Sequence, residues 1–148
     1  MRQRFSPELA YRLEKSGWFA GRATEEELNR VHFPMHPVGA RFLTEFGGLT
    51  IGSHLFCNAY YVNESYGHHE RLAVLSGLPN LLPVAVIWYW GEGSLWLDAA
   101  GHAYLSDDYE LAYVGKTVEE ALEVLILGKE IPPHYRRWEI PPAEIDGE

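Results

Sequence analysis

The longest apolar run of the chain is followed closely by a segment in which apolar and polar residues alternate. The run, residues 81–90, reads LLPVAVIWYW and is rich in β-branched and aromatic residues, which favours a buried strand. In residues 94–98 two leucines alternate with a serine, a tryptophan and an aspartate, as in a strand with one buried face. Because the sequence between them is Gly-Glu-Gly, the pattern predicts a β-hairpin.

A second chain reversal is predicted at residues 98–101, which read Asp-Ala-Ala-Gly. The Asp98 carboxylate can accept backbone N–H bonds across the turn, and Gly101 can adopt a positive φ. The chain is therefore expected to return through residues 102–105 and again through residues 109–114. These strands form an antiparallel meander.

Helical patterns lie on both sides of this meander. Thr117 and Glu120 form a T-x-x-E capping box, and the apolar residues after them recur at helical spacing until Gly128. Further helices are predicted before the sheet, at residues 7–16, 24–34, 37–46 and 70–78. Shorter strands are predicted at residues 49–51 and 55–61, and a loop at residues 63–69.

This order of elements predicts an α+β fold, a mostly antiparallel sheet with helices covering one face. A chain of 148 residues with 47% hydrophobic and 22% charged residues suits one domain with a single core. We place the domain at residues 1–130. Residues 131–148 form a Pro-rich, acidic C-terminal tail, which Tyr135 and Trp138 can dock on the domain.

Four sequence blocks occur in one order along the chain. They are residues 16–22 (SGWFAGR), 41–49 (RFLTEFGGL), 82–84 (LPV) with 97–101 (LDAAG), and 118–128 with Glu120-Ala121-Leu122. Together these blocks resemble the SUKH superfamily of bacterial immunity proteins, in particular its third subgroup, over residues 5 to 130. The resemblance implies the same α+β architecture.

Charge is distributed unevenly along the chain, whose formal net charge is −9. Residues 91–123 hold eight acidic residues against Lys116 alone, a net charge of −7. Such a field repels phosphate backbones and attracts basic proteins. Direct nucleic-acid binding is therefore disfavoured, and a basic protein partner is favoured.

The cysteine count and the apolar segments indicate the cellular compartment. Cys57 is the only cysteine, so an internal disulfide and a multi-cysteine metal site are excluded. No segment has the pattern of a signal peptide, and the longest apolar run is about half the length of a transmembrane helix. We expect a cytoplasmic protein without a membrane role.

Candidate catalytic groups are few. His32 and His36 have i, i+4 spacing, but the intervening Pro34 opposes a helix that presents both rings to one metal. The triplet at residues 68–70 (His-His-Glu) is typical of a polar loop, and Cys57 of a packed side chain. We therefore expect no catalytic residue, no metal site and no cofactor.

Aromatic residues and acids in and around the predicted sheet favour a binding role. Trp88, Trp90 and Trp96 have the parity of one cross-strand cluster, and rings rimmed by acids are typical of interface hot spots. The alternative is that these rings belong to the core. The predicted partner-binding residues are the acids and tyrosine of the turns and two tryptophan anchors: Trp90, Glu92, Trp96, Asp107, Asp108, Tyr109 and Glu110.

The SUKH resemblance implies an immunity protein that binds and neutralises a cognate polymorphic toxin by non-catalytic, stoichiometric inhibition. Toxins countered by this family are commonly nucleases or other nucleic-acid-modifying effectors, and a basic toxin surface would match the acidic segment. A second hypothesis is a general interaction scaffold, since the superfamily resemblance extends to a eukaryotic regulator of cell-wall synthesis. A third is a small metal-dependent hydrolase that uses the histidines. Oligomeric state is open.

Overall fold

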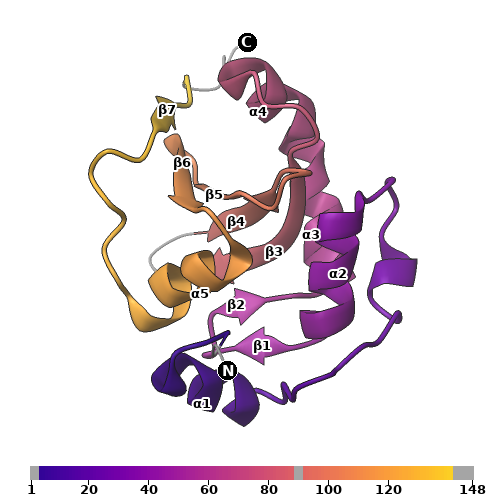
Figure 1. Cartoon of the computed structure of the whole chain (residues 1–148). Helices are drawn as coiled ribbons and strands as arrows, with labels where there is room; N and C mark the ends of the chain where they lie inside the picture. Colours follow the sequence, from indigo (N-terminus) through magenta and orange to yellow (C-terminus); the bar gives the residue numbers. More distant parts are fainter. Residues whose placement is uncertain (1–3, 89–91, 142–148) are drawn as a thin grey trace.

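The computed structural model describes residues 4–88 and 92–141 of the chain. Along the chain, groups of helices are separated by groups of strands (Figure 1). The elements, in chain order, are α1 (Pro7–Lys15), the 3-10 helix η1 (Leu28–Arg30), α2 (Pro37–Phe46), β1 (Thr50–Ile51), β2 (Leu55–Phe56), α3 (Ala59–Ser65), the 3-10 helix η2 (Tyr66–His68), α4 (His69–Ser76), β3 (Leu82–Trp88), β4 (Glu92–Leu97), β5 (Ala103–Ser106), β6 (Glu110–Gly115), α5 (Val118–Leu127) and β7 (Arg137–Glu139).

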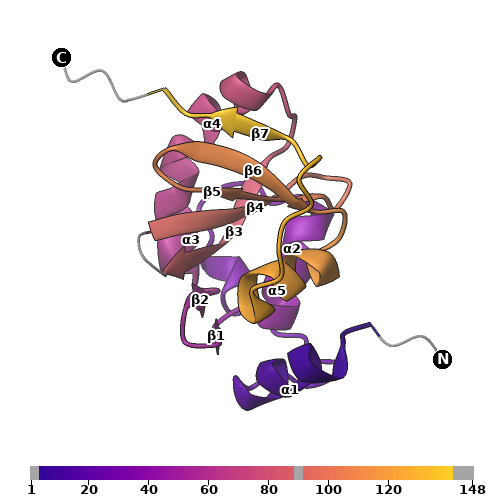
Figure 2. The same ribbon diagram turned by 90° about the vertical axis from the view of Figure 1, so that its left-hand side faces the viewer.

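Seven strands among the described residues form one antiparallel sheet in the order β1-β2-β3-β4-β5-β6-β7. Each strand therefore pairs with its neighbours in sequence, and Figure 2 shows them stacked from β1 at the bottom to β7 at the top. This arrangement confirms the predicted α+β class and the antiparallel meander. The register places Trp88 opposite Glu92 and Ser94 opposite Ser106.

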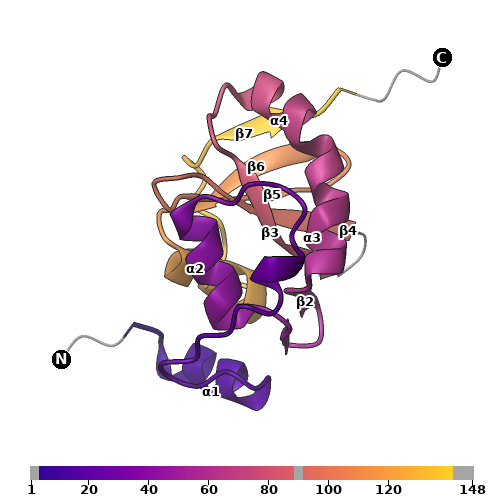
Figure 3. The same cartoon turned by 90° about the vertical axis from the view of Figure 1, so that its right-hand side faces the viewer.

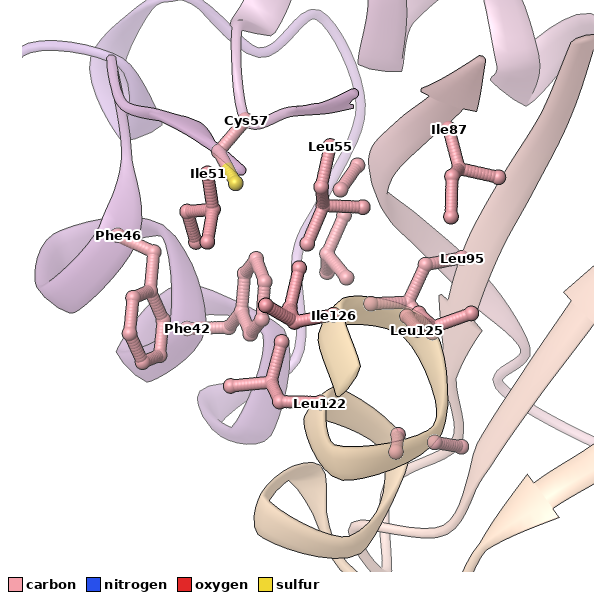
Figure 4. Close-up of a cluster of buried hydrophobic side chains, with 14 of the residues drawn as sticks. Phe42, Phe46, Ile51, Leu55, Cys57, Ile87, Leu95, Leu122, Leu125 and Ile126 are labelled. Carbon is pink, nitrogen blue, oxygen red and sulfur yellow. The ribbon is translucent and has the colours of Figure 1, made fainter. Parts of the chain in front are cut away.

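One face of the sheet packs against α1, α2 and α5. Side chains from these helices, such as Phe42, Phe46 and Leu122, meet Leu95 and other strand residues in one buried cluster (Figure 4). In Figure 4 Leu122 and Ile126 of α5 lie toward the two phenylalanines of α2, whereas Leu125 lies beside Leu95. Burial of these large apolar groups is the main stabilising contribution of this layer.

The other face of the central strands is also buried. Trp96, Tyr104 and Leu111 lie in a second cluster with Leu72 of α4 and Ile140 of the C-terminal segment. The prediction that residues 94–98 have one buried face is therefore wrong. The tryptophan at the alternate position is as deeply buried as the leucines on either side of it.

The predicted turn and helix boundaries are largely confirmed. Asp98 Oδ1 accepts the N–H groups of Ala100 and His102, both at 2.9 Å, and Gly101 has a φ of 96°. Thr117 Oγ1 accepts the Glu120 N–H at 3.1 Å to cap α5. The predicted helix over residues 37–46 matches α2.

Residues 24–34 do not form the predicted helix, and only η1 is helical there. The reason is a tertiary contact: Glu27, instead of completing a capping box with Thr24, uses Oε1 to accept the Ala59 N–H at 2.8 Å. Glu27 is itself buried, and while Oε1 bonds to the start of α3, Oε2 accepts from Arg30 Nη1 at 3.1 Å. This long-range bond takes the place of a local helix cap.

The predicted strand over residues 55–61 and loop over residues 63–69 are also incorrect. Strand β2 ends at Phe56, and α3 with η2 covers most of the remainder. The buried residues Ala59, Val62 and Ser65 recur every three positions, which is a helical spacing. The tyrosines of this segment favour a strand by residue type. In the structure Tyr60 and Tyr61 lie on the outer side of α3, away from its buried residues.

The C-terminal segment, as far as residue 141, completes the sheet. Strand β7 pairs with β6, with Leu111 opposite Trp138, and Tyr135 and Ile140 are buried. Trp138 packs against the second cluster. Tyr135 and Trp138 thus dock this segment on the domain.

Gly115, at the end of β6, lies close against the start of α5. A Cβ atom there would lie 2.8 Å from Ala121 N and 2.9 Å from Thr117 O. We expect Gly115→Ala to lower the free energy of unfolding by about 1–3 kcal/mol, because backbone must move to relieve the overlap. Urea denaturation measures this loss.

Gly67→Ala is the matched control, since a Cβ at Gly67 meets no atom within 4 Å. That variant should be as stable as the original chain or slightly more stable. Equal stabilities of the two variants would contradict the close approach of β6 and α5.

Candidate functional site

The two N-terminal sequence blocks, residues 16–22 and 41–49, are joined to each other by hydrogen bonds. Arg22 donates from Nη1 to Glu45 O at 2.7 Å and from Nη2 to Gly47 O at 2.9 Å, which satisfies carbonyls at the end of α2. Trp18 Nε1 donates to Glu45 Oε2 at 2.9 Å, and Arg4 forms an ion pair with the same carboxylate. The polar groups of these blocks are thus paired with one another, in structural roles.

Asp98 has a structural role of the same kind. Besides the two turn N–H groups, it accepts the Tyr104 hydroxyl on Oδ2 at 3.1 Å. Its side chain is largely buried. Because its acceptor sites are used within the turn, Asp98 is not placed to act on a bound molecule.

The histidine pair considered for a metal does not assemble. His36 Nδ1 accepts the Gly39 N–H at 3.0 Å as the N-cap of α2, and its Nε2 is 3.0 Å from Leu97 O. Both ring nitrogens are therefore engaged by backbone. Among residues 4–88 and 92–141, no three histidine, cysteine, aspartate or glutamate side chains are grouped so as to hold a metal ion.

The buried ionisable groups with shifted pKa values favour unreactive forms. Burial raises the pKa of the Cys57 thiol to about 12, with Arg22 opposing the effect. Burial and the neighbouring Asp98 carboxylate raise the pKa of Tyr104. A thiol or phenol that stays protonated is a poor nucleophile or base. Both groups therefore fit core roles.

A cavity of about 310 Å³ lies between α3, α4 and the ends of β4 and β5. Its floor includes Ser65, Ser94 and Ser106, where Ser65 Oγ and Ser94 Oγ are 2.8 Å apart. Six charged or ionisable side chains line it: Glu64, His68, Arg71, Glu92, Asp107 and Asp108. We refer to it as the acidic cavity. Four carboxylates thus face one arginine and one histidine.

The carboxylates of the acidic cavity are largely unneutralised. Within the described part of the chain, no ion pair involves Glu64, Glu92 or Asp108, while Asp107 Oδ1 accepts the Tyr109 and Glu110 N–H groups. A second cavity, of about 200 Å³, differs because Arg4 there pairs with both Glu45 and Glu119. Negative charge in the acidic cavity therefore remains available to a partner.

The structure brings together part of the predicted binding set. Glu92, Asp107 and Asp108 line the acidic cavity. They come together because Ser94 pairs with Ser106, so that β4 begins and β5 ends on the same side of the sheet. Tyr109 is 79% exposed in the adjoining turn. Glu110 instead pairs with Arg137 of β7 at 2.8 Å, so its charge is offset.

Of the two predicted tryptophan anchors, the structure describes only Trp96, which is buried. Trp96 has no exposed surface, and its Nε1 donates to Ser106 Oγ at 2.8 Å behind the cavity wall. It therefore supports the wall and does not reach the surface. Trp90 lies outside the described residues.

An aromatic group lies beside the acidic cavity, and Trp88 is its one member that the sequence pattern had indicated. Phe56 contacts both Tyr61 and Trp88, at ring distances of 5.9 and 6.1 Å, and Tyr61 contacts Tyr60 at 5.2 Å. We call Phe56, Tyr60, Tyr61 and Trp88 the aromatic cluster. A helical reading of residues 59–65 would have placed Tyr60 and Tyr61 on one turn with Glu64 on the next.

Comparison with known proteins identifies one family. The model of the SUKH-3 immunity protein family matches residues 5–128, most of the chain. No curated protein and no solved structure matches the chain. In the part of the chain that the structure describes, no helix combines the length and apolar character needed to cross a bilayer.

The burial of Cys57 predicts a protected thiol. At about pH 8, far below the pKa of about 12, the thiol stays protonated, and the thiolate is the reactive form. A disulfide reagent such as DTNB should leave the folded protein unmodified and react fully after denaturation. Reaction of the folded protein at the rate of a small free thiol would contradict this placement.

Proposed function

Because the chain belongs to the SUKH-3 immunity protein family, we propose that it neutralises a cognate bacterial toxin by binding it stoichiometrically, without catalysis. The observation that carries the finer part of this proposal is the acidic cavity, whose carboxylates Glu64, Glu92 and Asp108 form no ion pair with any residue that the structure describes. The surface it would meet on the toxin is basic. A nuclease or another nucleic-acid-modifying effector has such a surface where it binds phosphates.

Electrostatics supports this assignment. Carboxylates gathered around one depression repel one another, which lowers the stability of the isolated fold. A basic partner relieves the repulsion and is attracted over a distance of about one Debye length, roughly 8 Å at physiological salt. Fast capture suits an inhibitor that must reach the toxin before the toxin reaches its substrate.

The proposed contact residues follow from exposure and charge. Glu92, Asp107 and Asp108 supply the negative rim, and Tyr109 supplies an exposed ring next to them. Glu110 is left out of the proposed contacts, because Arg137 already pairs with its carboxylate. Inhibition then requires only that the bound protein cover or block the basic site of the toxin.

Co-expression with the toxin domain encoded beside this protein tests the proposal. The protein should restore survival and form a one-to-one complex whose association rate falls as salt rises. The double variant Glu92→Lys/Asp108→Lys should lower the affinity about 10- to 100-fold, mainly through slower association, because two attractive charges become repulsive. Surface plasmon resonance at two salt concentrations separates the rates.

Glu14→Lys is the control, since Glu14 is an exposed acid on α1, outside the acidic cavity. One such change should slow association far less than the double variant. Absence of any complex at low salt would overturn the toxin pairing. Unchanged association of the double variant would overturn the acidic cavity as its surface.

A further inference from the structure

The aromatic cluster exposes large rings that the fold does not use. Tyr60 is 68% exposed and Trp88 53% exposed, although both contact other rings of the cluster. Tyr60 and Trp88 therefore keep more than half of their surface hydrated when the protein is alone, whereas Phe56 and Tyr61 are half-buried. Exposed aromatic rings gathered in one place mark interaction sites more often than scattered single residues do.

The aromatic cluster is continuous with the acidic cavity through two different elements. In the sheet, Trp88 lies directly opposite Glu92, which lines the cavity. In α3, Glu64 follows Tyr60 by four residues, so the two lie on neighbouring turns of one helix face. Figure 3 shows α3 running beside the sheet toward α4, past the ends of β3 and β4. Rings and carboxylates thus form one surface.

We propose that the aromatic cluster is the hydrophobic anchor of the toxin-binding surface. It receives an apolar side chain of the toxin, while an adjacent arginine or lysine of the toxin enters the acidic cavity. This inference rests on the toxin-binding function proposed above. The anchor rings are Tyr60 and Trp88, which are exposed, whereas Trp96, the anchor predicted from the sequence, is buried.

The chemistry of the two parts determines this occupant. Tryptophan and tyrosine are the residues most enriched at interface hot spots, since they bury a large area with little loss of side-chain freedom. The neighbouring carboxylates would be left desolvated by a purely apolar partner. A segment that carries both an apolar and a cationic side chain satisfies both parts, and a guanidinium also stacks on aromatic rings.

A second copy of this chain is disfavoured as the occupant. In a two-fold dimer the same surface patch faces itself, so the acidic cavities of both copies would approach each other. Carboxylates of the cavity such as Glu92 and Asp108 would then repel across the interface. The charge of the surface therefore favours a basic partner over self-association.

The test measures binding of the toxin domain encoded beside this protein to Tyr60→Ala, Trp88→Ala and the double variant. Each single change should weaken the complex about 10- to 100-fold through faster dissociation, as expected for truncated hot-spot rings. The salt dependence of association should stay as in the original chain, because no charge is altered. This signature separates the rings from the carboxylates.

Tyr11→Ala is the matched control, since Tyr11 is 60% exposed on α1 and does not belong to the aromatic cluster. It should bind the toxin with unchanged rates. Thermal melting checks that each variant is folded. If Trp88→Ala melts early, Tyr60→Ala decides the question, because Tyr60 is the most exposed ring of the cluster.

The outcomes distinguish the two proposals. If the original chain binds the toxin and the folded aromatic variants bind equally well, the anchor is overturned and the toxin-binding function stands. If the original chain forms no complex, the function fails and the anchor fails with it. If the aromatic variants lose self-association in sedimentation but keep toxin binding, the cluster is a dimer contact and the inference is overturned.

Discussion

Burial of the central meander on both faces is the constraint on which the rest of the structure depends. Strands β3 to β6 carry Leu95 and Leu97 into a cluster with α1, α2 and α5, and Trp96 and Tyr104 into a second cluster with α4 and the C-terminal segment. Both faces of these central strands are therefore buried. We accordingly propose that recognition uses the ends of the strands and the outer sides of the helices.

The polar residues of the sequence blocks serve this framework. Arg22 closes the end of α2, Asp98 closes the turn between β4 and β5, and Glu27 fixes the start of α3. In each case a buried or partly buried charge is held by hydrogen bonds, which offsets the cost of removing it from water. These groups are thereby withdrawn from chemistry, whereas Glu64, Glu92 and Asp108 of the acidic cavity form no ion pair with a described residue.

The proposed recognition surface joins two kinds of interaction with different physical roles. The charges of the acidic cavity act at a distance and guide association, whereas the rings of the aromatic cluster act on contact and retain the partner. Their continuity depends on the position of α3, which supplies Tyr60 and Tyr61 to the aromatic cluster and Glu64 to the lining of the acidic cavity. The start of α3 in turn depends on the bond between Ala59 N–H and Glu27. A structural contact and the binding surface are thus coupled through one short helix.

Local sequence patterns determined much of this protein. The capped helices α2 and α5, the Asp98 turn and the meander follow from residues close together in the chain, and four ordered blocks indicated the family. Three acids of the later cavity, Glu92, Asp107 and Asp108, were also identified from charge alone. Tertiary structure decided the rest: that Trp96 is buried, that Glu27 bonds to the start of α3, and that Tyr60 and Trp88 belong to one aromatic cluster through Tyr61 and Phe56. These outcomes depend on which distant segments pack together, and short-range periodicity carries no information about that packing.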